Sequence, residues 1–194
     1  MKTPASSFLR FLACSLLLWT PATFAYKTPL KLPAREYPIL DCFAVAASTY
    51  DIPAEYLWAI GSVESSLTSV VGPRNKNGTY DIGIMQINTS HLKYLQKFGV
   101  SRKRLLKEPC LNIHIGAWVL RGNIDAHGET WEAVGAYNAS KRRPDLRLKY
   151  ARKVRKKLAW LVEWRNKHTQ AAGTPSQAAG TRSKRRRDAN KRTG

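Results

Sequence analysis

The stretch Asp51–Leu67, DIPAEYLWAIGSVESSL, predicts a helix that carries a carboxylate on its apolar face. Asp51 suits a helix cap, and Pro53 is tolerated in a first turn because the backbone N–H groups there lack partners. The residues that share one helical stripe are Leu57, Ile60, Glu64 and Leu67. An ionisable group on such a stripe faces the core or a cleft beside it.

Glu64 is therefore the first candidate for chemistry. Desolvation disfavours the charged form of a carboxyl, so its pKa should rise towards that of a usable general acid. The structural alternative is a Glu64 side chain that reaches solvent or pairs with a buried arginine. The segment alone leaves both interpretations open.

Apolar residues at helical spacing predict further helices on both sides of this segment. These helices cover residues 39–50, near 90–98, 111–126 and 129–137, and from Pro144 to about Lys167, with a basic one-turn segment around residues 101–107. In the last helix the core stripe consists of Tyr150, Val154, Leu158 and Leu161, while Lys and Arg fill the other faces. The chain is expected to be mostly α-helical.

Residues 74–88, RNKNGTYDIGIMQIN, break this helical pattern. Asn77-Gly78 is a strong tight-turn signal between two short runs, so the segment predicts one small β-hairpin. Gly83 then gives a point where another backbone or a ligand can approach closely. The expected fold is a single helical domain with this hairpin.

Length and charge narrow the class of protein. The chain has 194 residues, enough for one domain of ordinary size plus its ends, and a formal charge of +20. Such a charge predicts attraction to nucleic acid, an acidic membrane surface or an anionic cell-wall polymer. Residues 169–194 lack large apolar residues and predict a disordered basic tail.

Residues 1–25 predict a secretory signal peptide cleaved after Ala25, because a short charged start precedes an apolar run too short to span a bilayer. Residues 26–38 predict an extended lead-in, and residues 39–168 the folded domain. The mature chain is expected to be exported, periplasmic or associated with the cell wall, with no transmembrane segment. Nucleic acid is not an expected partner of an exported protein.

Removing the signal peptide leaves two cysteines, Cys42 and Cys110. In an oxidising compartment such a pair is more often a disulfide than two free thiols or part of a metal site. Closing a loop of about 69 residues would stabilise the fold by about 4 kcal/mol on the chain-entropy model. The histidines show no paired ligand spacing, so neither a metal nor another cofactor is expected.

Four motifs occur in order along the chain: Glu64-Ser65, the run Asp81–Asn88 (DIGIMQIN), Pro109 with Asn112 and Gly116, and Ala136-Tyr137-Asn138. Together they resemble the lysozyme-like lytic transglycosylases of the soluble-transglycosylase type. The small exported members that accompany type III and type IV secretion, conjugation and pilus assembly are the most similar in pattern. The resemblance covers about residues 39–160 and implies a lysozyme-like α+β fold with the hairpin beside an active-site cleft.

The resemblance also implies cleavage of the bond between N-acetylmuramic acid and N-acetylglucosamine in peptidoglycan, leaving a 1,6-anhydro end. Glu64 would be the catalytic acid and base, and Ser65 would position it or the sugar. The implied substrate-binding residues are Gly83, Met85, Gln86, Tyr137 and Asn138, with Tyr137 hydrogen-bonded near the carboxyl. The plainer alternatives are Met85 as core filler and Tyr137 as a packed aromatic. Secretion, conjugation or pilus components are possible partners.

Asp81 leaves open whether the implied reaction is transglycosylation or hydrolysis. The run DIGIMQIN is also similar to animal-type lysozymes, in which an Asp at the matching place is the second catalytic carboxylate. Asp81 could therefore support hydrolysis, or it could cap the turn or hold a hairpin hydrogen bond. A further alternative is a catalytically silent protein that only binds peptidoglycan; an intact Glu64 with Tyr137 argues against it.

Overall fold

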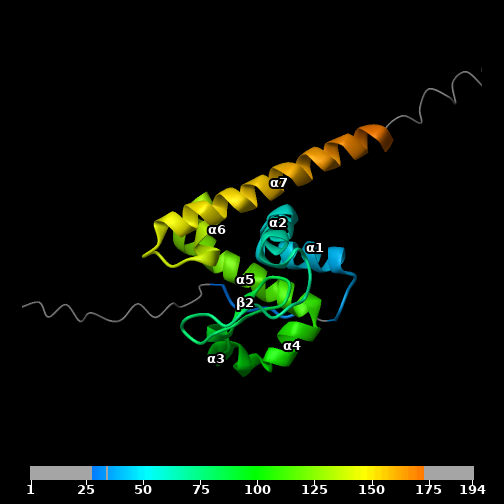
Figure 1. The fold of residues 1–194 in the computed structure, drawn as a ribbon. Coiled ribbons are helices and arrows are strands. Elements are labelled where there is room, and N and C mark those ends of the chain that lie inside the picture. Colours follow the sequence, from blue (N-terminus) through cyan, green and yellow to red (C-terminus); the bar gives the residue numbers. More distant parts are fainter. Residues whose placement is uncertain (1–27, 34, 173–194) are drawn as a thin grey trace, which may run out of the picture.

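The computed structural model describes residues 28–33 and 35–172, and Figure 1 shows packed helices with one small two-stranded sheet. The expected signal peptide and residues 173–194 of the expected tail lie outside the described residues. The elements are α1 (Ile39–Tyr50), α2 (Ala54–Ser65), β1 (Asp81–Ile82), β2 (Ile87–Asn88), α3 (Leu92–Leu95), α4 (Arg102–Lys107), α5 (Pro109–His127), α6 (Trp131–Asn138) and α7 (Pro144–Ala172), with short 3₁₀ turns on either side of α3. The prediction of a mostly helical chain with one small sheet is confirmed.

The junction of α1 and α2 differs from the sequence prediction. Asp51 has φ of 51° and closes α1, because its backbone N–H donates to the carbonyl of Ala47. Pro53, not Asp51, precedes the first turn of α2, and it makes no side-chain capping bond. A residue before proline avoids helical geometry, so Ile52 separates the two helices. The prediction that Asp51 caps α2 is therefore wrong.

Helix α2 ends at Ser65, immediately after Glu64. Ser66 and Leu67 have φ of 55° and 63°, in the left-handed region that terminates a helix. Leu67 therefore lies beyond the helix rather than on its stripe, contrary to the prediction, although it still packs against the core. Glu64 occupies the last turn of α2, where the chain leaves the helix.

The hairpin also differs from the prediction. Strand β1 pairs with β2 in antiparallel register, with Ile82 opposite Ile87, so the turn is residues 83–86. Asn77-Gly78 instead forms the tip of the preceding loop, where the Gly78 N–H donates to the Asn75 carbonyl at 2.8 Å. The antiparallel bridge between Val71 and Ile82 and the Gly72 N–H bond to the Asp81 carbonyl at 2.8 Å close this loop. The turn predicted at Asn77-Gly78 is therefore present, but β1 and β2 are joined by the next turn along the chain.

Helix α5 forms the centre of the core, and its buried residues include Leu111, Ile113, Ile115, Trp118 and Leu120. Helices α1 and α6 pack against it (Figure 1). The predicted disulfide is confirmed: Cys42 of α1 is bonded to Cys110 in the first turn of α5, with 5.0 Å between their Cα atoms. The lead-in packs on the same core, because the Trp118 indole N–H donates to the Thr28 carbonyl at 3.0 Å.

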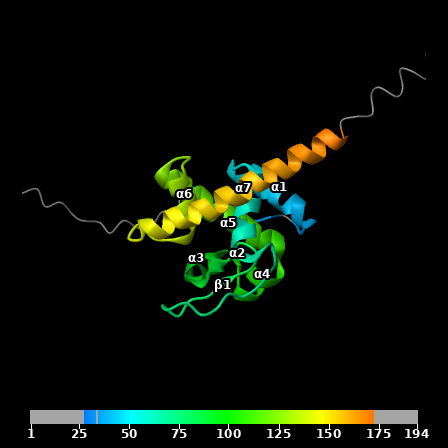
Figure 2. The same ribbon diagram turned by 45° about the horizontal axis from the view of Figure 1, so that its top comes forward.

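Helix α7 lies across α6 and α2, and its C-terminal end projects beyond the rest of the domain (Figures 1 and 2). It runs to Ala172, past the predicted end near Lys167. Tyr150 and Val154 are buried as expected, and Gly135 allows α6 to approach closely, since a Cβ there would lie 2.7 Å from the Arg147 carbonyl oxygen. None of the helices among the described residues is long and apolar enough to cross a membrane.

Candidate active site

Glu64 lies in a largely buried position in the last turn of α2. Its Oε1 accepts a hydrogen bond from the Tyr150 hydroxyl of α7 at 2.5 Å. Burial raises the pKa of Glu64 to about 7; the Tyr150 hydrogen bond lowers it, the charge of Asp81 raises it, and Lys153 lowers it. A carboxyl with this pKa is protonated in part of the population at neutral pH and can donate its proton to a leaving group or take it back.

Tyr150 was missed as a site residue, because the sequence assigned it only to the core stripe of α7. It is 4% exposed, and burial, with the charge of Glu64, raises the pKa of its hydroxyl well above the usual range. The hydroxyl therefore stays a donor. One signal was available: a tyrosine on a buried stripe needs a partner for its hydroxyl. Glu64, on another buried stripe, needed a donor.

Tyr137 of α6 lies beside this pair. Its ring stacks on that of Tyr150, with centroids 6.5 Å apart, but its hydroxyl donates to the Met85 carbonyl at 2.9 Å. Burial, followed by the charges of Glu64 and Asp81, raises the Tyr137 pKa well above its usual range. Tyr137 thus ties α6 to the hairpin turn, while the Glu64 carboxyl accepts its hydrogen bond from Tyr150.

Asp81 uses both carboxylate oxygens within its own loop and hairpin. Oδ1 accepts from the Asn88 amide at 2.7 Å, and Oδ2 accepts from the Asn75 amide at 2.9 Å. This arrangement matches the hairpin hydrogen-bond interpretation of Asp81. Its negative charge still acts on Glu64, whose pKa it raises.

The turn between the strands is fixed by a buried amide of α5. Asn112 accepts from the Met85 N–H at 2.8 Å and donates to the Ile82 carbonyl at 2.9 Å and the Leu105 carbonyl at 3.0 Å. Gly83 has φ of 81°, and a Cβ there would lie 2.2 Å from the Asn112 amide nitrogen. The close approach expected at Gly83 is made by the Asn112 amide and by the Leu105 backbone, whose carbonyl oxygen would lie 2.7 Å from that Cβ.

The remaining residues of the expected substrate site divide into three settings. Met85 is fully buried and fits against Gly116, where a Cβ would lie 2.7 Å from the Met85 side chain, so Met85 acts as core filler in this structure. Ser65 donates to the Ile84 carbonyl at 2.8 Å, and Gln86 donates to the Gly83 carbonyl at 2.7 Å. Asn138 is exposed at the end of α6.

One group of three possible metal ligands occurs within residues 28–33 and 35–172, namely Glu36, Cys42 and Cys110. The two sulfur atoms are bonded to each other, which leaves them unable to act as thiolate ligands. The two cysteines therefore form a covalent cross-link between α1 and α5, and this group is not a metal centre.

The chain belongs to the transglycosylase SLT domain family, whose model matches residues 41–160. Membership of this family makes the protein a peptidoglycan lytic transglycosylase by class.

Its relatives include invasion protein IagB of Salmonella typhimurium (strain SL1344), 42% identical over 116 residues, with 59% of this chain and 72% of that protein covered. Protein IpgF of Shigella flexneri is also 42% identical over 116 residues and is 76% covered. The X polypeptide of Escherichia coli strain K12 is 37% identical over 119 residues and is 70% covered.

The fold is similar to that of an inactive variant of the lytic transglycosylase Slt from Pseudomonas aeruginosa, with a TM-score of 0.53 and 22% identity. The match covers 65% of this chain and 24% of that longer one. The likeness supports the fold assignment.

Proposed function

We propose that the protein cleaves the bond between N-acetylmuramic acid and N-acetylglucosamine in peptidoglycan, with Glu64 as the only catalytic carboxylate. The observation that carries the proposal is the largely buried Glu64 carboxyl, hydrogen-bonded to Tyr150, with a pKa of about 7. Such a group is protonated in part of the population at neutral pH, as a general acid must be.

In the proposed reaction the Glu64 proton passes to the glycosidic oxygen as the bond to the muramic anomeric carbon breaks. The Glu64 carboxylate then takes the proton of the 6-hydroxyl of the same sugar, and that oxygen bonds to the anomeric carbon. The products are a free hydroxyl on N-acetylglucosamine and a 1,6-anhydromuramyl end. Glu64 ends the cycle protonated, and no water is consumed.

The setting of Asp81 favours this route over hydrolysis. A second catalytic carboxylate must approach the anomeric carbon or activate a water there. Both Asp81 oxygens accept hydrogen bonds from the amides of Asn75 and Asn88 instead. Lysozyme-type hydrolysis with Glu64 and Asp81 is the second candidate, supported by the effect of the Asp81 charge on the Glu64 pKa.

We further propose that the enzyme works outside the cytoplasm and opens the wall locally for a secretion or pilus apparatus. Support comes from the expected signal peptide, from the Cys42–Cys110 disulfide, and from similarity to a protein named for invasion. Disulfides persist in oxidising compartments such as the periplasm.

The test is mass spectrometry of muropeptides released from purified peptidoglycan in ¹⁸O-labelled water. The wild type should release 1,6-anhydro products without the label, and Glu64→Gln should release none. Glu163→Gln is the matched control, because Glu163 is an exposed residue of α7 paired with Lys167. Reducing ends that carry ¹⁸O would establish hydrolysis instead. Equal release by wild type and Glu64→Gln would exclude Glu64 as the acid, and binding without release would leave the silent peptidoglycan-binding alternative.

A further inference from the structure

The C-terminal half of α7 presents an unusual exposed surface. Trp160 and Trp164 are 53% and 48% exposed and lie one turn apart on the helix. Exposed lysines flank them, namely Lys156, Lys157 and Lys167. We call these five residues the α7 end surface. The single acidic side chain within this half of α7 is Glu163, and it pairs with Lys167.

Internal packing explains part of this surface only. The Trp160 ring stacks on Trp58 of α2 at 6.0 Å, and the Trp164 ring stacks on His168 of its own helix at 4.2 Å. About half of each indole nevertheless stays in contact with solvent. A shallow groove beside them, lined by Trp131, Leu158, Ala159 and Val162, adds further apolar area. Exposed apolar area of this kind marks an interaction site.

The sequence that follows α7 is strongly basic. It continues from Ala172 with Arg182, the run Lys184–Arg187, Lys191 and Arg192, against one acidic residue, Asp188. In the sequence, this cationic stretch begins 10 residues after the end of α7. Figures 1 and 2 show that this end of α7 projects beyond the rest of the domain, so a flat surface can reach it.

We propose that the α7 end surface docks the protein on an anionic phospholipid bilayer. Indole rings prefer the boundary between acyl chains and headgroups, and lysines beside them are attracted to anionic lipids. A glycan strand fits less well, because its carboxylates sit at intervals on stem peptides, whereas an anionic bilayer offers a continuous negative surface. Glu64 is left free, since its partner Tyr150 lies roughly 20 Å along the helix from Trp164.

The test uses the mature protein and two kinds of vesicle, phosphatidylcholine alone and phosphatidylcholine mixed with phosphatidylglycerol. The wild type should co-sediment with the mixed vesicles alone, and added salt should weaken the binding. The double variant Lys156→Gln/Lys157→Gln should bind about 25-fold more weakly, at about fivefold per lysine. Trp164→Ala should weaken binding and reduce quenching of tryptophan emission by brominated lipid.

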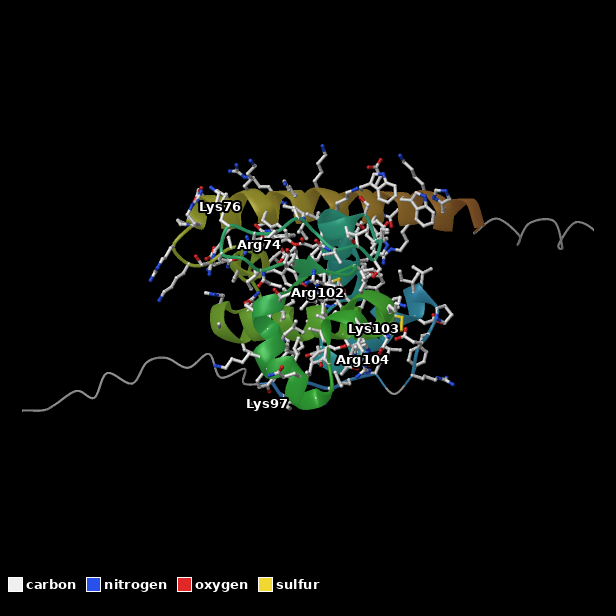
Figure 3. All side chains as sticks on the ribbon, turned by 60° about the horizontal axis from the view of Figure 1, so that its bottom comes forward. Arg74, Lys76, Lys97, Arg102, Lys103 and Arg104 are labelled. Atoms are coloured by element: carbon white, nitrogen blue, oxygen red, sulfur yellow. A yellow bond between two sulfur atoms is a disulfide. The ribbon has the colours of Figure 1, made fainter. Side chains whose placement is uncertain are left out.

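The matched control is Lys97→Gln/Lys103→Gln, which removes the same charge from the opposite side of the domain (Figure 3). It should bind nearly as tightly as the wild type, and thermal melts should show all variants folded. The proposal is overturned if both double variants lose equal affinity, if vesicle composition makes no difference, or if binding occurs only to isolated peptidoglycan. The readout is binding, so its outcome is independent of the proposed reaction.

Discussion

The end of α2 and the start of the hairpin each carry one acidic residue, and the two are held in opposite ways. Glu64 is largely buried and receives one donor, the Tyr150 hydroxyl. Asp81 receives two amide donors, from Asn75 and Asn88. Burial raises the pKa of Glu64, whereas both Asp81 oxygens are occupied by hydrogen bonds within the loop and hairpin. The surroundings of these two carboxyl groups, more than their residue types, therefore separate a candidate acid from a hairpin hydrogen-bond acceptor.

The largest effect expected from this contrast is on activity. Glu64→Gln should lower kcat/KM on peptidoglycan by about 10²–10⁴-fold, the range for removal of a general acid. Asp81→Asn should lower it by less than about tenfold, because it replaces one hydrogen-bond acceptor of the hairpin and leaves burial, the largest cause of the raised Glu64 pKa, unchanged. Turbidity assays with both variants check this. Equal losses would make Asp81 a second catalytic carboxylate.

The hairpin can be tested through its glycines. Gly83→Ala should destabilise the fold by about 2–4 kcal/mol, because φ is 81° and the new Cβ would lie 2.2 Å from the Asn112 amide. Gly78→Ala is the matched control, since φ is 82° there but the nearest atom is the flexible end of Arg74, at 3.2 Å. It should cost about 1 kcal/mol. Urea unfolding of both variants measures the difference, and equal costs would contradict the role of Asn112.

These glycines also show how far sequence reasoning could go. Helical spacing placed Glu64 on an apolar face, and the exported context predicted the Cys42–Cys110 bond, because both signals are local or compositional. The turn at residues 83–86 was out of reach, since Asn112 of α5 fixes it from 27 residues away. The local signal at Asn77-Gly78 predicted the neighbouring turn, which the Val71–Ile82 bridge closes.

The candidate active site was also only partly predictable from local sequence patterns. The α7 stripe predicted that Tyr150 is buried, but no local pattern pairs its hydroxyl with a carboxyl 86 residues away. Gly83 and Met85 belong to the motif, yet they fit Asn112 and Gly116 rather than open space. Packing that shapes the turn therefore dictates these two residue types. The motif alone does not distinguish residues needed for such packing from residues that contact the substrate.

The burial of Glu64 should also be visible as a pH-dependent cost to stability. Its pKa is about 7 in the folded protein against 4.5 for the free group, so the folded state binds more protons and loses stability as pH rises between these values. Glu64→Gln keeps an acceptor for Tyr150 and removes the titration. It should be more stable than the wild type by up to about 3 kcal/mol at pH 8.

At pH 4 the two proteins should unfold at nearly the same urea concentration, since Glu64 is then protonated in both states. Asp81→Asn provides the contrast. It should destabilise the fold at pH 8, because an amide donor replaces an acceptor that Asn75 or Asn88 requires. A Glu64→Gln protein less stable than wild type at pH 8 would show that the carboxylate is stabilised by the fold.

The smallest expected effect concerns the donor to Glu64. Tyr150→Phe removes a hydrogen bond that lowers the Glu64 pKa, so the pKa should rise above about 7. Because Glu64 must be protonated to act as an acid, the alkaline limb of the kcat/KM profile should move to higher pH. The rate itself should fall by about tenfold, as positioning of the carboxyl is lost.

Tyr137→Phe is the matched control, because its hydroxyl donates to the Met85 carbonyl and leaves the Tyr150–Glu64 bond in place. Tyr137→Phe should lower the melting temperature, and it should shift the alkaline limb of the kcat/KM profile less than Tyr150→Phe does. The other charged groups that act on Glu64, Asp81 and Lys153, are unchanged in both variants. If the limb moved to lower pH in Tyr150→Phe, the hydroxyl would be favouring the protonated carboxyl, and the contrast between Glu64 and Asp81 would rest on burial alone.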